Sequence, residues 1–390
     1  MPTEVNGHQE SGTREQASGA TRPVVPGANA DLGASAATAK VLDRAVQGQR
    51  LDASEVEMLF AEATLHELGA AASAVRLRLN PGTEVTYIID RNINYTNVCV
   101  YRCRFCAFYR KPEDADAYVL PFETIAAKVA ETVAAGGTGI LLQGGVHPRL
   151  RITFYENLLR DLKRAFPQVH LHAYSAPEIW YIAKLEKLPV AEVIARLKEA
   201  GLESIPGGGA EVLEDDTRKR IWSRSKASTA QWLDVHRAAH RLGLRTTATM
   251  MFGVGEPNSA RVEHFLRVRE LQDETGGFTA FIPWTFQEEN TAMDGEVPVS
   301  GGFDYLRTLA ISRLTLDNIQ HVQGSWVTQG PKIGQLSLFF GADDLGSIML
   351  EENVVAAAGA HFRMSQADME QLIRDAGFVP RQRRTLYERL

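Results

Sequence analysis

The sequence has few cysteines, no excess of basic residues and no long apolar stretch. Its 390 residues include three cysteines, too few for a disulfide framework, so a reducing cytoplasm is the expected compartment. The net charge of -6 gives no reason to expect nucleic acid as a partner. No apolar run is long enough to span a membrane, so no membrane partner is expected either. The beginning of the sequence also lacks the charged and then apolar pattern of a secretory signal.

The rest of the composition is that of an ordinary globular protein, with 44% apolar and 23% charged residues. Residues 1–38 are rich in Ala, Gly, Ser, Thr and Pro, and we expect a disordered tail there, with a functional arm as the alternative. Residues 39–84 carry apolar side chains at helical spacing, which predicts an N-terminal helical cap of two or three helices.

From residue 85 onward, short apolar runs alternate with amphipathic helical patterns. Strands are expected at 85–97, 139–145, 169–175, 203–211, 245–253, 278–287, 321–328 and 346–350. Helices are expected near 122–135, 153–165, 189–200, 228–242, 258–275, 303–318 and 365–376. Eight such units predict an α/β fold, a TIM-type (β/α)8 barrel with C-terminal elements over residues 85–390. A doubly wound open sheet is the alternative, but no GxGxxG pattern follows the first strand.

The three cysteines lie close together, in the loop after the first expected strand. Cys99, Cys103 and Cys106 have the spacing C-x3-C-x2-C, which is typical of thiolates that hold a metal centre. A structural zinc site would need a fourth ligand, and His147 is the nearest histidine beyond the loop. Three thiolates on a [4Fe–4S] cluster leave one iron open, as a catalytic centre requires. The spacing therefore favours a catalytic [4Fe–4S] cluster, with zinc as the alternative.

This spacing, with Phe105 just before the last cysteine, resembles the radical S-adenosylmethionine superfamily. Longer stretches such as "VTYIIDRNINYTNVCVYRCRFCAFYR", "HAYSAPEI" and "SWVTQGPKIGQL" resemble the cyclic dehypoxanthinyl futalosine synthase family, and the resemblance runs from about residue 40 to the C-terminus. One departure is "FQEENT" at 286–291, where the family pattern reads "FQPGNT".

The resemblance implies an activity as well as a fold. A [4Fe–4S] cluster and S-adenosylmethionine would generate a 5′-deoxyadenosyl radical, which removes the C4′ hydrogen from the ribose of dehypoxanthine futalosine. The carbon radical would then attack the benzoate ring, and the ring would lose an electron and a proton. This is a step of menaquinone biosynthesis by the futalosine pathway. An electron donor such as flavodoxin or ferredoxin is the implied protein partner.

The resemblance also implies a set of cofactor-binding residues at the carboxyl ends of the strands. Glu211 and Arg220 form an acid–arginine pair like the one that binds S-adenosylmethionine in relatives, although Arg218 is also available and a solvated basic turn is the alternative. Gly144 and Gly145 suit either a close ligand approach or a tight turn. The full expected set is Phe105, Gln143, Gly144, Gly145, Ser175, Glu211, Arg220, Thr249 and Met251. For the methionine, core packing is the alternative.

Aromatic and amide side chains at the later strands suit an aromatic, polyoxygenated substrate. The expected substrate-binding residues are Arg110, Trp284, Gln287, Trp326, Thr328, Gln329 and Glu352. For Arg110 the alternative is a surface charge, and for Glu352 a solvated acidic face.

The final proton transfer needs a base, for which Glu178 and His172 are the catalytic candidates, with a tyrosine at the barrel mouth as a further candidate. The alternatives are that Glu178 caps a helix and that His172 is a hydrogen-bonded barrel histidine. Other functions consistent with the sequence are an aminofutalosine synthase, a deazaflavin-synthase-like enzyme and a non-catalytic iron–sulfur electron carrier.

Overall fold

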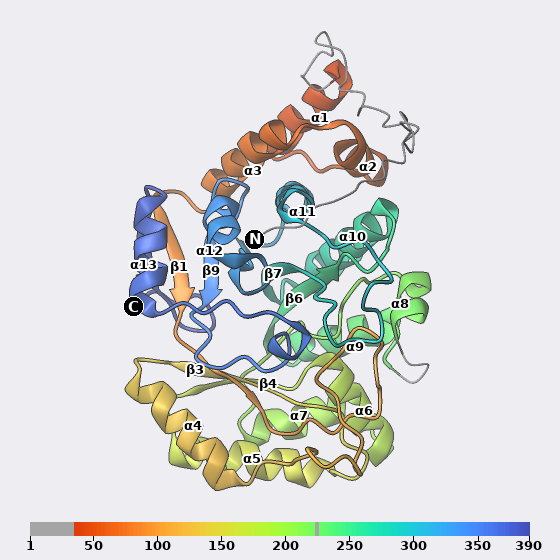
Figure 1. The fold of residues 1–390 in the computed structure, drawn as a ribbon, viewed down its shortest axis with the longest axis vertical. Helices are drawn as coiled ribbons and strands as arrows, with labels where there is room; N and C mark the ends of the chain where they lie inside the picture. Colours follow the sequence, from red (N-terminus) through yellow and green to blue (C-terminus); the bar gives the residue numbers. More distant parts are fainter. Residues whose placement is uncertain (1–34, 223–225) are drawn as a thin grey trace, which may run out of the picture. The chain divides into compact units, whose positions relative to one another are not determined.

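The computed structural model describes residues 35–222 and 226–390 (Figure 1). The expected tail, residues 1–38, therefore lies outside the described residues except for its last four positions. Three of these positions already belong to the first helix, α1 (Ala36–Val46), whose backbone is capped by Ser35. The helical cap thus begins earlier than the expected boundary at residue 39.

Three helices precede the barrel, as the apolar spacing predicts. After α1 come α2 (Ala53–Glu62) and α3 (Leu65–Leu79). Both of the later helices begin with a capping box, in which the Asp52 or Thr64 side chain and a glutamate three residues on satisfy each other's backbone N–H groups. The three helices pack against α10 (Asn258–Thr275) and α11 (Gly302–Thr315), on one side of the barrel (Figure 1).

The strands form a parallel barrel with eight strand positions. One sheet runs in the order β2 (Asn92–Asn94), β3 (Gly139–Gln143), β4 (His170–Ala173), β5 (Ser204–Ile205), β6 (Arg245–Phe252), β7 (Phe278–Thr285) and β8 (His321–Val322). A second sheet has the order β10 (Val379–Gln382), β1 (Glu84–Ile88), β9 (Asp344–Ser347). Because β1 continues along the chain into β2, and the Gln323–Asp344 bridge joins β8 to β9, the circle closes. The predicted TIM-type α/β fold is confirmed.

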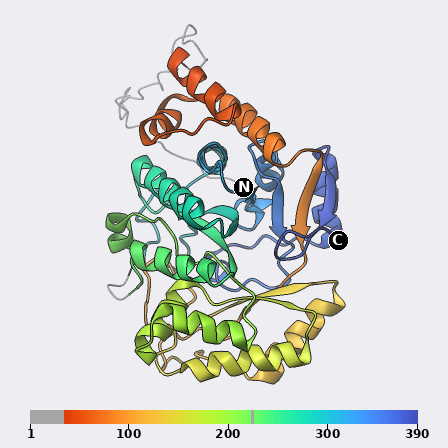
Figure 2. The ribbon, with the colours of Figure 1, turned by 180° about the vertical axis from the view of Figure 1, so that it is seen from behind.

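Helices cover the outside of these strands (Figure 2). The remaining elements are α4 (Phe122–Ala134), α5 (Ile152–Ala165), α6 (Ala176–Glu186), α7 (Val190–Ala200), α8 (Asp215–Ile221), α9 (Thr229–Arg241), α12 (Trp326–Ser337), a 3-10 turn (Ala356–Ala358) and α13 (Gln366–Asp375). Within the described residues, no helix is both long and apolar enough to cross a bilayer.

Two expected strands are much shorter than their apolar runs. The run at 321–328 gives a strand only at its first two positions, because Ser325 is the residue before α12 and the following residues are helical. The run at 203–211 likewise pairs only at Ser204 and Ile205, and the three glycines after it form a loop. The helices α6 and α8 were not expected. Each begins within ten residues after its strand, in the stretch expected to be a βα loop.

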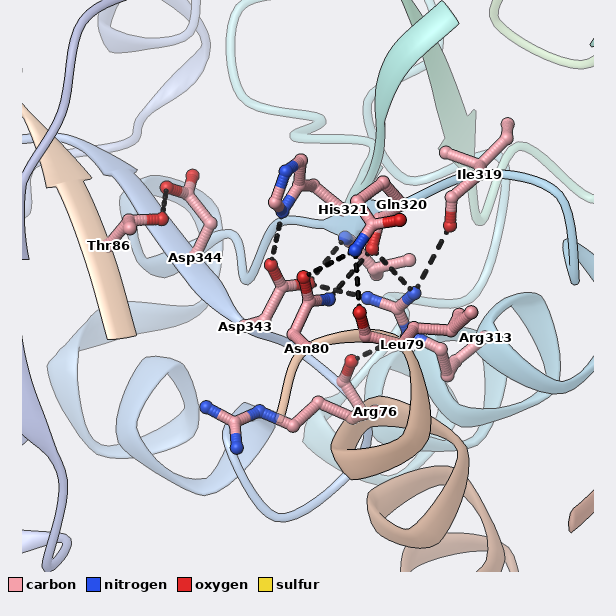
Figure 3. Close-up of polar contacts among 12 residues, drawn as sticks. Arg76, Leu79, Asn80, Thr86, Arg313, Ile319, Gln320, His321, Asp343 and Asp344 are labelled. Carbon is pink, nitrogen blue, oxygen red and sulfur yellow. Dashed lines mark hydrogen bonds and ion pairs between the residues drawn. The ribbon is translucent and has the colours of Figure 1, made fainter. Parts of the chain in front are cut away.

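A polar network, buried at Arg313 and Asp343, ties the last strand position to the helical cap (Figure 3). Arg313 donates to Asp343 at 2.5 Å and to the carbonyl of Gly341 at 2.9 Å. His321 approaches the other Asp343 oxygen at 2.6 Å. The Gln320 amide reaches the carbonyl of Leu79 at 2.6 Å, at the end of α3. Thus α3, α11, β8 and the start of β9 are joined by charged and amide groups as well as by apolar packing.

Candidate active site

The cysteine loop follows β2 and is fixed by backbone hydrogen bonds to its neighbours. Val100 N–H donates to the carbonyl of Val146 at 2.9 Å, after β3, and Arg104 N–H donates to the carbonyl of Ile221 at 3.1 Å, at the end of α8. Tyr101 is buried beneath the loop and donates to the carbonyl of Pro177 at 3.2 Å. The loop is therefore held at the carboxyl ends of the first four strand positions, the end of the barrel where ligands bind in this architecture.

The three thiols lie in a small apolar cluster with Tyr101, Val146 and, at its edge, Phe105. Burial raises the pKa of the Cys103 thiol to about 12, and it also raises the pKa of Cys106. The positive charge of Lys226 lies nearby and lowers the pKa of both thiols, against the effect of burial. A bound metal centre would replace the proton of each thiol and remove the cost of burying it.

The donor set fits a cluster better than a single ion. Among residues 35–222 and 226–390, no three His, Cys, Asp or Glu side chains lie close enough to hold one metal ion. The alternative of a mononuclear zinc site thus has no ligand set in this part of the chain. Three thiols on one loop, without a fourth side-chain ligand, are the donors that a [4Fe–4S] cluster with one open iron requires.

A buried ion pair stands beside the cysteine loop. Lys226 donates to Glu211 at 2.9 Å, and its ammonium group lies 5.0 Å from the centre of the Phe105 ring and 4.8 Å from that of Trp222. Glu211 adopts a left-handed backbone conformation, with φ of 40°, which is uncommon for a residue with a side chain. Its second carboxylate oxygen is buried with no hydrogen-bond partner among the described residues. Sequence reasoning found Glu211 but missed Lys226, since nothing in its local pattern distinguishes it from a surface lysine.

The two arginines of α8 differ in position. Arg218 is fully buried and donates to the carbonyls of Gly209 at 3.1 Å and Val212 at 3.2 Å, and its guanidinium lies 3.2 Å from the centre of the Trp222 ring. Burial lowers its pKa to about 9. Arg220, the expected cofactor ligand, instead reaches the carbonyl of Gly255 at 3.3 Å on an exposed side. Arg218 therefore holds the loop after β5, which carries the three glycines 207–209, through hydrogen bonds to its carbonyls. Arg220 lies on the exposed side of this region.

Gly144 and Gly145 are required by close packing after β3. A Cβ atom on Gly144 would come within 2.7 Å of the Tyr95 ring, and one on Gly145 would come within 2.4 Å of the Val98 carbonyl oxygen. These contacts bring the β3 loop directly against the chain that leads to the cysteines. The tight-turn alternative is therefore sufficient to explain both glycines, and it leaves their backbone near any bound cofactor.

Glu178, one of the candidate bases, is engaged in local structure. It accepts hydrogen bonds from the Tyr95 hydroxyl at 2.6 Å, from Gly144 N–H at 3.2 Å, and from the backbone and hydroxyl of Ser175 at 2.7 and 2.5 Å. The Ser175 contacts form the capping box of α6. Burial raises the pKa of Glu178 in spite of these donors. The side chain lies behind the β3 loop and does not line the barrel cavity.

The interior of the barrel holds a cavity of about 300 Å³. The expected site residues that line it are Gln143, His172, Thr249, Trp284, Trp326, Thr328 and Glu352. Its wall combines two indole rings with hydroxyl, amide and carboxylate groups. A cavity of this size and composition suits a small ligand with an aromatic part and several oxygens.

His172, another candidate base, lies in the cavity wall and is bound to its neighbours. Its Nδ1 lies 2.6 Å from the Ser204 hydroxyl, which also lies 2.7 Å from Nε2 of His170. Burial lowers the pKa of His172 to about 3, so its imidazole is neutral over the physiological pH range. A neutral imidazole with so low a pKa is a weak proton acceptor but a good hydrogen-bonding group.

The other expected site residues lie away from the cavity. Gln287 and Gln329 both donate to the Thr285 hydroxyl, at 3.1 and 2.5 Å, at the end of β7. Met251 is packed in the core, which is the alternative given for it above. Arg110 pairs with Asp116 at 2.6 Å and shapes the end of the cysteine loop.

Sequence reasoning missed three charged residues that line the cavity, namely Asp90, Arg245 and Arg383. Asp90 lies between β1 and β2, and Arg383 follows β10 near the C-terminus. The alternation of Asp90, Asn92 and Asn94 along one strand is a signal that places them on one face. Arg383 gave no such signal, because its approach to the barrel depends on the pairing of β10 with β1.

Comparisons with known proteins agree with this geometry. Residues 93–268 match the model of the Radical SAM superfamily, and residues 275–390 match that of the CofH/MqnC C-terminal region. The methylornithine synthase PylB has a similar fold, with a TM-score of 0.65, 18% identity, and coverage of 87% of this chain and 97% of that one.

Three curated relatives are similar over most of their length. The cyclic dehypoxanthine futalosine synthase of Streptomyces coelicolor is 49% identical over 90% of this chain and 88% of its own. The protein of the same name from Halalkalibacterium halodurans is 48% identical over 89% and 94%. The aminodeoxyfutalosine synthase of Thermus thermophilus is 37% identical over 89% and 94%. The chain therefore belongs to the radical SAM superfamily and, within it, to the family of the cyclic dehypoxanthine futalosine synthases.

Proposed function

We propose that this enzyme converts dehypoxanthine futalosine into cyclic dehypoxanthine futalosine, a step of the futalosine route to menaquinone. The observation that carries the proposal is the three-thiol loop at the carboxyl end of a barrel whose cavity suits an aromatic, oxygen-rich ligand. The level of identity to relatives of that name supports this substrate over those of other family members.

The thiols of Cys99, Cys103 and Cys106 would hold the [4Fe–4S] cluster, and S-adenosylmethionine would bind beside it. Together these groups supply the 5′-deoxyadenosyl radical that starts the reaction. The chain's own contribution begins with the apolar packing of Tyr101, Val146 and Phe105 around the thiols, which buries Cys103 and partly covers Cys99 and Cys106.

Glu211 and Lys226 are suited to bind the amino acid part of S-adenosylmethionine. The Glu211 oxygen that has no hydrogen-bond partner among the described residues, 4.0 Å from the Arg218 guanidinium, can accept from an ammonium group, and the Lys226 ammonium can donate to a carboxylate. The backbone of Gly144 and Gly145, with Gln143 and Ser175 on either side, would border the same cofactor. Thr249 donates to the Gly207 carbonyl at 2.7 Å and so shapes the neighbouring wall. Arg220 would contribute from the rim.

The substrate would occupy the barrel cavity. Trp284 and Trp326 offer flat faces to its benzoate ring, and the Trp326 indole is fixed by donation to the carbonyl of Ser347 at 3.0 Å. His172 and Thr328 offer hydrogen bonds to the polar groups of the substrate, and Glu352 lines the same wall. The chain's main work in this step is to hold C4′ against the benzoate ring while water is excluded.

The electron that starts each turnover would come from an external donor such as flavodoxin or ferredoxin. The three unpaired thiols also favour a reducing cytoplasm as the location. A non-catalytic iron–sulfur carrier would have no need for a ligand-sized cavity in the barrel.

Product mass tests the proposal. The anaerobically reconstituted enzyme, given S-adenosylmethionine, dithionite and dehypoxanthine futalosine, is expected to form a product lighter by two hydrogen atoms than the single substrate. An aminofutalosine synthase, the main alternative, would leave this substrate unchanged and would join the adenosyl group to an enolpyruvyl substrate instead. Release of no 5′-deoxyadenosine with any of these compounds would contradict the proposal and favour an electron carrier.

A further inference from the structure

Asp90 places a carboxylate in the wall of the cavity at mid-height of the barrel. It lies between β1 and β2, and its backbone carbonyl accepts from Leu350 N–H at 3.3 Å, just after β9. Among the described residues, the Asp and Glu side chains that line the cavity are Asp90 and Glu352. These two are therefore the acidic groups that a ligand in this cavity would meet directly.

Glu352 is already saturated by hydrogen-bond donors. One of its oxygens accepts from the N–H groups of Val354 at 2.6 Å and Val355 at 2.9 Å, which closes the loop after β9. The other accepts from the Asn92 side-chain amide at 3.0 Å. By contrast, the uncharged polar group that acts on the Asp90 carboxylate among the described residues is the hydroxyl of Ser347, which lowers its pKa. A carboxylate with one such neighbour retains capacity to accept from a ligand.

We propose that Asp90 is the proton acceptor of the ring-closing reaction, taking the proton that the benzoate ring loses when it regains aromaticity. The inference rests on the proposed function. After C4′ has bonded to the ring, the ring carbon at the new bond still carries its hydrogen. Its C–H bond breaks, the proton passes to an Asp90 oxygen, and the bonding pair returns to the ring. The one surplus electron leaves to an oxidised iron–sulfur cluster, so atoms and electrons balance.

The charges around Asp90 suit this task. Arg383 faces it with a positive charge, but that guanidinium is bonded to Asp344 at 2.6 and 2.8 Å, so its charge is largely offset. Burial raises the pKa of Asp90 to about 6, the Asp344 charge acts in the same direction, and Ser347 and Arg383 act against it. Glu352, the neutral His172, Arg245 and Tyr387 are the other titratable side chains in the cavity wall. Asp90 is thus ionised at neutral pH and still a much stronger proton acceptor than an ordinary aspartate.

The test compares Asp90→Asn with wild type and with Asp234→Asn, the same change on α9 at a side chain that is 60% exposed. Each protein is reconstituted anaerobically and given substrate deuterated at C4′. We expect Asp90→Asn to transfer deuterium to 5′-deoxyadenosine as wild type does, but to form cyclic product about 100-fold more slowly, the usual scale of general-base catalysis. Product formation by wild type should fall as pH drops through about 6. This fall in the rate of product formation at low pH, the pH limb, should be absent in Asp90→Asn and present in Asp90→Glu.

Two measurements on protein without cluster or cofactor separate proton transfer from folding and binding. Substrate titration followed by the fluorescence of Trp284 and Trp326 should give similar affinities for wild type and Asp90→Asn. The folded-state pKa of Asp90 lies above its ordinary value, so its neutral form stabilises the fold. The melting temperature of wild type, relative to Asp90→Asn, should therefore fall as pH rises from about 4 to 6 and then level off.

Several results would overturn the assignment. Cyclic product at the wild-type rate from Asp90→Asn would do so, as would an unchanged pH limb in that variant. Loss of substrate affinity together with loss of deuterium transfer would make Asp90 a binding residue instead. If wild type itself makes no cyclic product, the proposed function fails, a result distinguishable from failure of the Asp90 assignment alone.

Discussion

The buried carboxylate of Glu178 is held in place by its hydrogen-bond donors. Four of them, from Tyr95, Gly144 and the backbone and hydroxyl of Ser175, converge on its two oxygens. They join the start of α6 to the loop after β3 and to the chain that leads to the cysteines. On this geometry, Glu178 is a positioning residue, and Asp90 is the carboxylate that faces the ligand.

Glu178→Gln is therefore expected to affect stability more than proton transfer. An amide would turn N–H groups toward two of the four donors and leave a backbone N–H unpaired, at a cost of about 1–3 kcal/mol. The melting temperature should fall, whereas the pH limb of product formation near 6 should persist. Glu131→Gln, at a side chain that is 66% exposed, is the control and should change neither quantity. A stable Glu178→Gln protein that lacks the pH limb would instead identify Glu178 as the base.

Sequence reasoning found the residues whose chemistry is local and missed those that the fold brings in. The spacing of the three cysteines is visible within eight residues of sequence, and Trp284 and Trp326 lie near the ends of expected strands. Lys226 and Arg383 approach the site from a distant loop and from the C-terminal strand, and no short pattern marks them. Asp90 was missed although its alternation with Asn92 was visible, because the strand was assigned by its apolar residues.

At the scale of elements, Arg313 on α11 links a helix to the last strand position. Its side chain is completely buried and pairs with Asp343, which His321 also contacts (Figure 3). It also donates to the carbonyls of Ile319 and Gln320, just before β8, and of Gly341, just before β9. One guanidinium thus holds the segment that enters β8 against the segment that enters β9.

Replacement of this arginine, Arg313→Met, should destabilise the barrel strongly. The methionine would leave Asp343 charged and buried without its arginine, a change that typically costs about 3–5 kcal/mol. The measurement is the free energy of urea unfolding, with Arg164→Met on the exposed face of α5 as a control that should stay near wild type. A loss below about 1 kcal/mol would mean that the network does not hold these elements together.

The sequence predicts helices better than it predicts the shortest strands. The amphipathic pattern located α4, α5 and α10 closely, because a helix covering a barrel exposes one face over many residues. The strands β5 and β8 pair over only two residues each, so the apolar runs at 203–211 and 321–328 predict strands that are too long. Hydrogen-bonded pairing with neighbours, rather than apolar content, decides where these strands end.

At the scale of the whole molecule, the C-terminal segment closes the barrel opposite the cysteines. Thr385, Leu386 and Tyr387 line the cavity, and Leu386 and Tyr387 also line a second cavity of about 310 Å³ near the ends of α3 and α10. The Tyr387 ring stacks on His321 with centroids 3.8 Å apart, and Arg383 lies 3.9 Å from the centre of the same ring. The segment therefore separates two spaces that would otherwise join.

Removal of residues 384–390 is expected to open the reaction space to water. 5′-Deoxyadenosine should then form in excess over cyclic product, since a radical exposed to solvent components is quenched before the substrate reacts. The measurement is the molar ratio of the two products, with the melting temperature as a check on folding. Glu388→Gln, at a side chain that is 72% exposed, should keep a ratio close to one. A ratio near one in a folded truncated protein would contradict this role.

The central claim is that three thiols hold a cluster whose radical chemistry acts on the C4′ hydrogen of a substrate in the barrel. The most direct measurement is mass spectrometry of 5′-deoxyadenosine formed with substrate deuterated at C4′, for wild type and for Cys103→Ala. We predict one deuterium in the 5′-deoxyadenosine of wild type, and neither cluster iron nor 5′-deoxyadenosine with the variant. Unlabelled 5′-deoxyadenosine from wild type, or unchanged turnover by Cys103→Ala, would contradict the account.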